Sequence, residues 1–265
     1  EQGDENGETM AATLCGIWNG IHWKDVTRPD SRRLEDAFSD GVFTNEDRHL
    51  PGMWPVSNEV GGSNAGHIYN VDGTRADSLT QAMLKGRIQL QEYRRYYRDY
   101  LSGYEQAELI ISASQIGIRE TRRIQGEYQL NLQDFLNRAV FEDEIGRYCY
   151  PVDIHSSRNA SSGYQQYEKD FANLRYKKGE SYGIPYRSLV VKGLNNVLTA
   201  GRCISTDRSM QASVRVMPGC FITGQAAGCA AALASGKGGD TRSISIHRLQ
   251  QKLKTLGAYL PNVQD

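Results

Sequence analysis

The sequence reads NVLTAGR at residues 196–202 and RVMPG at residues 215–219, and the second stretch opens a run rich in glycine and alanine. We predict a strand, a turn and a helix here. Gly201 has no Cβ, so a ligand can approach the backbone closely. Pro218 suits the first turn of a helix, where a missing N–H costs nothing. This segment therefore predicts the wall of a cofactor site.

The predicted helix runs from Pro218 to about Ala234, and its small residues give it thin faces that can pack against a sheet or a flat cofactor. Unpaired N–H groups and the positive end of the helix dipole can hold a phosphate or a developing negative charge on a ring. The N1/C2 carbonyl edge of a flavin carries such a charge. The helix is almost long enough to span a membrane, but Gln225 and the excess of alanine and glycine favour a buried helix.

The chain has enough hydrophobic residues to form the core of one large domain or of two domains. It has 265 residues, of which 39% are hydrophobic. The counts of Lys+Arg and Asp+Glu are both 31, so no bulk charge favours nucleic acid or a membrane as a partner. The five cysteines show no C-x-x-C spacing, so we expect no zinc or iron–sulfur site and assign no metal ligand.

Hydrophobic periodicity and capping residues predict alternating helices and strands along the rest of the chain. Strands are expected at residues 9–21, 109–118, 121–130, 139–155 and 182–191, and helices at residues 30–38, 77–100, 131–137 and 246–256. The tyrosines near the end of the second helix form either an aromatic binding surface or an amphipathic packing face, and the helical spacing favours packing. Residues 41–73, rich in Gly, Asn, Pro and Asp, predict a long loop.

Several motifs occur in a fixed order between residues 116 and 234. They read IGIRETRRI at 116–124, YPVDIH at 150–155, GIPYRSL at 183–189, LTAGRCIS at 198–205, SVRVMP at 213–218 and GQAAG at 224–228. As an ordered set they resemble the bacterial FAD-dependent oxidoreductases of the two-dinucleotide-binding-domain type.

This resemblance implies FAD as the cofactor and an α/β fold. Residues 1–182 would form a mixed α+β substrate domain, and residues 183–265 would supply the closing strand and helix of a Rossmann-like FAD/NAD(P)-binding domain. The cofactor-binding residues that it implies are Gly201, Arg202, Cys203, Arg215, Val216, Met217, Pro218 and Gly219.

The sequence departs from that family in one respect. Its members begin with a strand, a G-x-G-x-x-G turn and a helix that bind the ADP half of FAD, and no such pattern occurs here. GGSNAG at residues 61–66 has the wrong spacing and no apolar strand before it, so we interpret it as a loop. We therefore expect a fragment whose N-terminal FAD-binding segment is missing or acts as a separate partner.

Two groups of residues are candidates for catalysis. His155 could serve as a base that takes a hydroxyl proton while hydride leaves for the flavin, and Asp153, two residues away, could orient it. A structural, hydrogen-bonded histidine is the alternative. Arg119, with Arg122 and Arg123 around Glu120, could clamp a substrate carboxylate or a phosphate, or could join neighbouring strands by salt bridges.

Three further residues lie near the predicted cofactor side. Arg187 and Arg215 could contact the cofactor, with Arg215 reinforcing the helix dipole, or each could form a surface ion pair. Cys203 could be a redox thiol, although a small buried residue is the simpler interpretation.

These observations lead to two hypotheses about function. In the first, the chain is an oxidoreductase that passes hydride from a small polar substrate, such as a sugar or hydroxy acid, to FAD. In the second, it holds no FAD and is a non-catalytic binding module or remnant. Flavin colour in the purified protein separates the two.

Overall fold

The computed structural model describes residues 2–4, 6–45, 47–157, 171, 174–236 and 238–264. The chain forms two compact units that are discontinuous in sequence. Unit 1 comprises Glu1–Glu8, Arg119–His155 and Tyr164–Asp265, and unit 2 comprises Thr9–Ile118 and Ser156–Gly163. These units cross the boundary predicted between residues 182 and 183. The separate roles assigned to the two sides of that boundary stay predictions.

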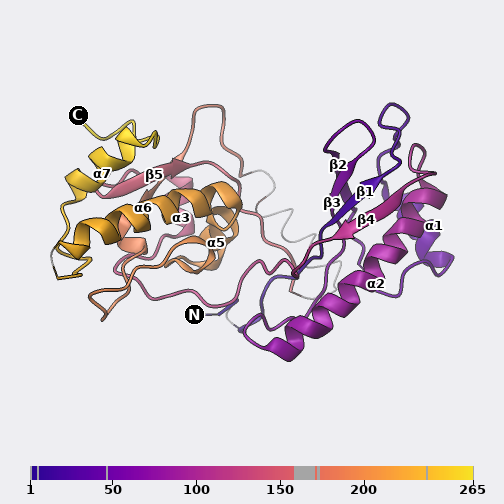
Figure 1. Ribbon diagram of the computed structural model, residues 1–265, viewed down its shortest axis with the longest axis horizontal. Coiled ribbons are helices and arrows are strands. Elements are labelled where there is room, and N and C mark those ends of the chain that lie inside the picture. Colours follow the sequence, from indigo (N-terminus) through magenta and orange to yellow (C-terminus); the bar gives the residue numbers. More distant parts are fainter. Residues whose placement is uncertain are drawn as a thin grey trace. The chain divides into compact units, whose positions relative to one another are not determined.

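Unit 2 is built on a four-stranded antiparallel sheet in the order β2-β3-β1-β4 (Figure 1). The strands are β1 at Gly16–Asn19, β2 at Gly52–Pro55, β3 at Gly61–Asn64 and β4 at Glu108–Ser112. The predicted strands at residues 9–21 and 109–118 are present but shorter than expected. Ala12 and Thr13 contribute only isolated bridges ahead of β1.

The prediction of a loop at residues 61–66 was wrong, because Gly61 and Gly62 lie in β3, in the interior of this sheet. Their missing side chains explain both the strand and the error. A Cβ on Gly62 would lie 2.8 Å from the ring of Trp54, and a Cβ on Gly61 would lie 2.6 Å from Ile21. Glycine in a strand interior marks such close approaches, whereas its composition resembles that of a turn.

Two helices complete unit 2, α1 at Ser31–Ser39 and α2 at Ala76–Tyr100. Asp30 caps α1, since its side chain accepts a hydrogen bond from the Arg33 backbone N–H. The residue at the cap position of α2 is Arg75, whose side chain makes no cap hydrogen bond. Tyr93, Tyr96 and Tyr97 are buried in the hydrophobic core with Trp18, so the packing interpretation of the tyrosines is confirmed.

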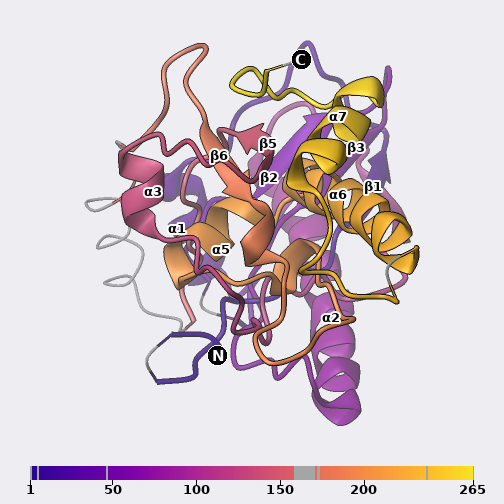
Figure 2. The same cartoon turned by 90° about the vertical axis from the view of Figure 1, so that its left-hand side faces the viewer.

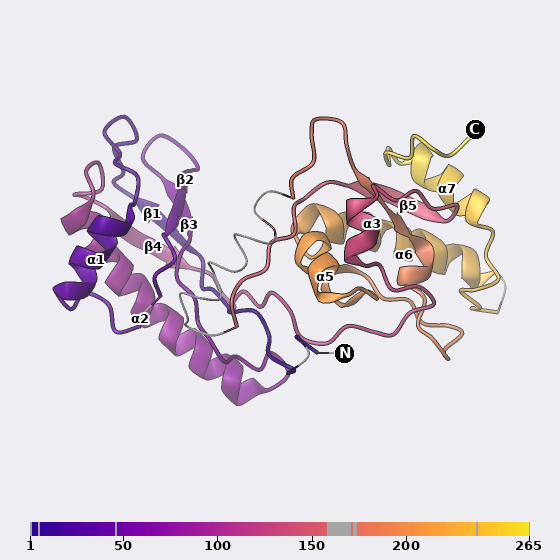
Figure 3. The same cartoon turned by 180° about the vertical axis from the view of Figure 1, so that it is seen from behind.

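Unit 1 combines a two-stranded antiparallel sheet with helices packed along it (Figure 3). Its elements are α3 at Leu132–Leu136, β5 at Glu144–Tyr148, β6 at Tyr182–Pro185, α5 at Arg208–Val214, α6 at Met217–Ser235 and α7 at Ile246–Thr255. The mixed α/β fold class is confirmed. The strand predicted at residues 121–130 is wrong, because this segment forms only isolated bridges.

Helix α6 lies beside α7 and buries only one stripe (Figure 2). The buried residues of α6 are Gly219, Thr223, Ala226, Ala230 and Ala234. The predicted buried helix is therefore buried along one stripe only, where small residues let α6 pack closely. By length and composition alone α6 also passes as a membrane-span candidate, with 28% of its apolar window buried, which is weak evidence.

Candidate functional site

The N-terminus of α6 is an open helix end in unit 1. Pro218 lies in its first turn as predicted, and Val216 at the cap position makes no side-chain cap hydrogen bond. The first-turn N–H groups of an α-helix have no partner within the helix. Two large apolar side chains near this end, Met217 and Phe221, are 72% and 69% exposed. The helix end therefore combines polar backbone donors with an apolar surface.

Gly201 lies against the first turns of this helix. Its N–H donates to Thr223 Oγ1 at 2.9 Å, and a Cβ on Gly201 would lie 3.5 Å from the sulfur of Cys220. Gly201 has φ +74°, in the left-handed region that glycine adopts at little cost. The strand predicted for residues 196–202 is wrong: Leu198 makes one isolated bridge to Val190, and Gly201–Cys203 is a 3-10 turn.

The two cysteines beside this turn have local backbone partners. Cys203 Sγ donates to Ala200 O at 3.4 Å, and Cys220 Sγ donates to Arg215 O at 3.1 Å. Burial raises the pKa of Cys220, the opposite of what a reactive thiolate needs. Arg202, in the same turn, is exposed.

Asp153, His155 and Arg215 meet just ahead of α6. His155 Nε2 lies 3.3 Å from Asp153 Oδ2, and Arg215 Nη2 lies 3.1 Å from the same oxygen. Arg215 Nη2 also donates to the backbone oxygen of Asp153 at 2.9 Å. Arg215 is the C-cap of α5 and immediately precedes Val216, the N-cap of α6. The predicted Asp153–His155 pair is therefore tied to the start of that helix. Arg215 forms an ion pair here, but its side chain is only 9% exposed, so this is not the surface ion pair of the alternative.

The carboxyl group of Asp153 is held in its charged form. Burial alone would raise its pKa, but the hydrogen bond and charge of His155, then the charges of Arg215 and Arg119, outweigh burial and lower the pKa to about 2. An ionised carboxylate next to an imidazole favours the imidazolium form of that ring. The arrangement can therefore accept a proton on His155.

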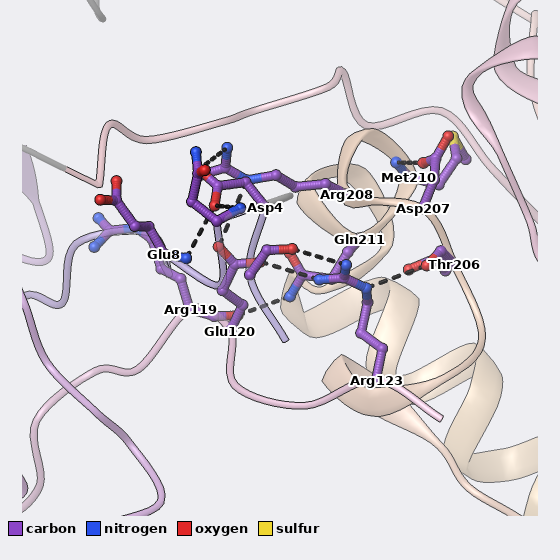
Figure 4. A network of polar contacts seen from close by, with 12 residues as sticks. Asp4, Glu8, Arg119, Glu120, Arg123, Thr206, Asp207, Arg208, Met210 and Gln211 are labelled. Atoms are coloured by element: carbon purple, nitrogen blue, oxygen red, sulfur yellow. Dashed lines mark hydrogen bonds and ion pairs between the residues drawn. The ribbon is translucent and has the colours of Figure 1, made fainter. Parts of the chain in front are cut away.

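Arg119 and Arg123 are buried in a polar network that also includes the N-terminal segment (Figure 4). Arg123 contacts Glu120 at 3.3 Å and donates to the backbone oxygens of Thr206 and Gly3. Arg123 therefore forms a salt bridge with Glu120, as the alternative to a substrate clamp predicted. Arg119 differs because its charge acts on Asp153.

The same network fixes the N-terminal segment through α5. Arg208 contacts Asp4 at 3.4 Å and Glu120 at 3.8 Å. Gln211 donates to the backbone oxygen of Arg119 at 2.9 Å. Residues far apart in the sequence thus hold the IRETRR segment in one place.

Two tyrosines that the sequence analysis did not single out border the site. Tyr150 OH lies 3.5 Å from Asp153 Oδ2, and burial followed by the charge of Asp153 raises its pKa. Burial raises the pKa of Tyr148 to about 12, although a hydrogen bond with the Gly219 backbone N–H acts to lower it. Tyr148 and Tyr150 are two residues apart and their rings stack, with centroids 6.5 Å apart. Residues at i and i+2 of a strand lie on the same face, so this spacing is the sequence pattern that could have indicated the pair.

Arg187 lies outside this group of residues. It forms an ion pair with Asp143, with Nε 2.9 Å from Oδ2, and its side chain is half exposed. Among the residues that the structure describes, no cluster of three or more His, Cys, Asp or Glu side chains could hold a metal ion.

Comparison with known protein families matches residues 1–253 to the family described as FAD dependent oxidoreductase. Neither the curated proteins nor the solved structures gave a match. The family match covers most of the chain and agrees with the motifs between residues 116 and 234. The chain belongs to the FAD-dependent oxidoreductase family, and its cofactor is FAD.

Proposed function

We propose that this protein oxidises a small polar substrate, with His155 accepting the substrate's hydroxyl proton while hydride leaves the adjacent carbon. FAD, when bound, supplies the hydride acceptor. One observation carries the proposal: Arg215 joins the Asp153–His155 pair to the residue that begins α6.

The residues around the α6 N-terminus fit a flavin. The helix end has no side-chain cap, and Gly201 brings its backbone to the first turns without a Cβ. In this proposal the backbone N–H of Met217 and the positive end of the helix dipole hold the polar edge of the ring, and Gly201 and Gly219 lie beside it without side chains in the way. Arg202, Cys203, Arg215, Val216 and Pro218 complete this wall.

His155 and Asp153 divide the proton chemistry between them. The carboxylate of Asp153 can only accept, so the hydrogen of a neutral His155 ring lies on Nε2 and Nδ1 becomes the basic nitrogen. Asp153 then stabilises the imidazolium that forms when Nδ1 takes the proton. Arg215 fixes Asp153, and we propose that Arg119 orients a polar or anionic group of the substrate.

The proposal includes a separate nucleotide-binding segment. The ADP half of FAD needs a phosphate-binding turn, and the sequence has no G-x-G-x-x-G pattern. In this proposal a separate segment supplies this turn and binds the ADP half of FAD, while the residues at the N-terminus of α6 bind the flavin ring.

The test uses the FAD-loaded protein and anaerobic bleaching of the flavin absorbance by a panel of polyols and hydroxy acids. With a bleaching compound in hand, we expect His155→Gln to slow flavin reduction by about 10²–10⁴-fold at unchanged flavin content. His247→Gln, a change at an exposed position on α7, is the matched control and should reduce the flavin at the normal rate.

Two results would contradict the proposal. Protein that stays colourless after FAD and a nucleotide-binding segment are added would favour the non-catalytic alternative. Bleaching only by strongly apolar compounds would refute the polar substrate class.

A further inference from the structure

A groove runs between helices α6 and α7, both of which belong to unit 1. Its volume is about 760 Å³, which is within the range of small-molecule sites in proteins. Gly228 is the first residue of α6 to line it, and at 1.5 Å per residue it lies about 16 Å along the helix from Met217. The groove is therefore separate from the proposed flavin wall at the N-terminus of α6.

The α6 side of the groove is apolar. It is lined by Gly228, Cys229, Ala232 and Leu233. Helix α6 carries no charged residue over its whole length, Met217–Ser235. Because three of the four lining residues are small, an apolar chain can lie close along the helix and make many van der Waals contacts. Covering this floor removes apolar surface from water, which favours binding.

The α7 side of the groove is polar and basic. Arg248, Gln251 and Lys252 line it, and their i, i+3 and i+4 spacing places them on one face of α7. Arg248 and Lys252 are exposed, and among the described residues neither forms a salt bridge. None of the described lining residues carries a carboxylate, and residues 217–264 contain a single acidic residue, Asp240. The groove therefore has a positive charge along one edge.

The two sides of the groove together select the chemistry of a ligand. A small inorganic anion would pair with the α7 side and leave the apolar floor in contact with water. A neutral apolar compound would cover the floor and leave Arg248 and Lys252 without a partner. A molecule with a carboxylate at one end and an apolar chain at the other satisfies both sides, because its charge pairs at the edge while its chain is buried on the floor.

We propose that the α6–α7 groove binds a free, water-soluble carboxylate with an apolar chain. The carboxylate pairs with Arg248 and Lys252, and the chain lies over Ala232 and Leu233. The ligand is bound without any covalent step. The site needs neither FAD nor the Asp153–His155 pair, so it can be tested whether or not the chain oxidises a substrate.

A structural role for the two cations is the alternative. Ala232 and Leu233 lie in the last turns of α6, where the negative end of the helix dipole attracts a cation. Arg248 and Lys252 would then stabilise the end of α6 and stay hydrated, as surface cations commonly do. This role gives no preference for the chain length or for the charge sign of an added compound. Those two preferences separate the hypotheses.

The first experiment titrates the unmodified full chain with octanoate, hexanoate and octylammonium in a calorimeter. Octanoate should bind with one-to-one stoichiometry, and added NaCl should weaken the binding by screening the charge pairs. Hexanoate should bind about five- to fifteenfold more weakly, because each buried CH₂ contributes up to about fourfold in affinity. Octylammonium, with the same chain and the opposite charge, should not bind. No binding of octanoate, or equal binding of octylammonium, would overturn the proposal.

The second experiment locates the bound octanoate through Cys229 on the floor of the groove. Its thiol is alkylated with N-ethylmaleimide, and mass spectrometry follows the modified peptide over time. Octanoate should slow the alkylation of Cys229 in proportion to the occupancy measured by calorimetry. The alkylation of the exposed Cys15, which belongs to unit 2, should keep its rate. Binding of octanoate without protection of Cys229 would place the ligand elsewhere and refute the site.

Two neighbouring alanines of α6 offer a matched pair of variants for the floor. Ala231 and Ala232 are both exposed, but only Ala232 lines the groove. Ala232→Glu places a negative charge beside the ligand, so we expect it to weaken octanoate binding by more than about tenfold. Ala231→Glu makes the same change outside the groove and should bind octanoate normally. Equal affinities in the two variants would refute the proposal.

A second matched pair tests the basic edge. Arg248→Gln removes a cation that lines the groove, and we expect octanoate to bind about two- to fivefold more weakly, since the pair is partly exposed. Lys254→Gln removes a cation of the same helix whose Nζ contacts the backbone oxygen of Val263 and which does not line the groove. This control should keep the affinity of the unmodified protein. An equal loss in both variants would mean that only the net charge of the protein matters, and would overturn the assignment of the edge.

Discussion

Asp153 keeps its negative charge in a mostly buried position because His155 and Arg215 contact the same carboxylate oxygen. Its side chain is 29% exposed, so solvent screens these contacts only in part. The folded-state pKa of about 2 lies below the ordinary value of 3.8. The charged form is therefore more stable in the folded protein than in the unfolded chain.

This difference predicts a specific acid sensitivity. A depressed carboxyl pKa stabilises the fold fully above the unfolded value of 3.8, and the stabilisation is lost as pH falls toward the folded value of about 2. We expect Asp153→Asn to remove about 2 kcal/mol of unfolding free energy near neutral pH. In the acid range the unfolding free energy of this variant should fall less steeply with pH than that of the unmodified protein. Urea unfolding at a series of pH values measures both effects.

The control for this prediction is Asp77→Asn. Asp77 pairs with Arg75 on the exposed start of α2, where an ion pair contributes little. Its unfolding curve should follow that of the unmodified protein at every pH. Parallel pH curves for Asp153→Asn and the unmodified protein would refute the assignment of the shift to Asp153.

At the level of single residues, the sequence predicted what lies close along the chain. Asp153 and His155 are two positions apart, so their pairing could be predicted from the motif. The contact between Arg215 and Asp153 spans 62 residues, and no local pattern carries that information. The contact between His67 and Asp47 spans 20 residues within a segment whose composition predicts a loop, so no periodic pattern indicates it.

Helix α3 shows how capping residues stabilise a short element. It has five residues, and Asn131 and Asp134 form a reciprocal capping box at its start. Removing an N-cap side chain leaves a helix N–H without a partner. We expect Asn131→Ala to cost about 1 kcal/mol of unfolding free energy, measured by urea unfolding monitored by circular dichroism.

Asn137→Ala is the matched control at the other end of α3. Among the described residues, the Asn137 side chain accepts a single hydrogen bond, from the exposed Gln133 side chain, so its loss should change stability little. Equal effects at the two ends would mean that the capping box contributes nothing specific.

Elements with strong local signals were predicted well, and elements defined by tertiary contact were not. The caps and periodicity of α1, α3 and α7 located these helices within one or two residues. Strand β3 has no β-branched residue to indicate it, because its glycines are there to admit neighbouring side chains. The segments at 121–130 and 196–202 look like strands by composition, yet within the described part of the chain they form isolated bridges and, from Gly201, a 3-10 turn.

The three tryptophans of the whole molecule, Trp18, Trp23 and Trp54, all belong to unit 2. Tryptophan fluorescence therefore reports on this unit selectively. Gly86 on α2 offers a way to destabilise unit 2, since a Cβ there would lie 2.7 Å from the Cβ of buried Leu14. We expect Gly86→Val to lower the stability measured by fluorescence by about 2 kcal/mol, through overpacking.

Gly224→Val is the control in unit 1. Gly224 is also a helical glycine, on α6, but a Cβ there meets nothing within 4 Å. The substitution should leave the fluorescence-detected transition where it is. A fluorescence shift as large as that of Gly86→Val would refute the assignment of this signal to unit 2.

The contacts of Gly3 and Asp4 set an order of events during biosynthesis. Their partners Arg123 and Arg208 lie 120 and 204 residues downstream. As the nascent chain leaves the ribosome, residues 9–118 emerge and can collapse around Trp18 long before Arg208 has been translated. Gly3 and Asp4 are therefore made well before their partners, and they reach their native contacts only after the intervening 9–118 segment has emerged.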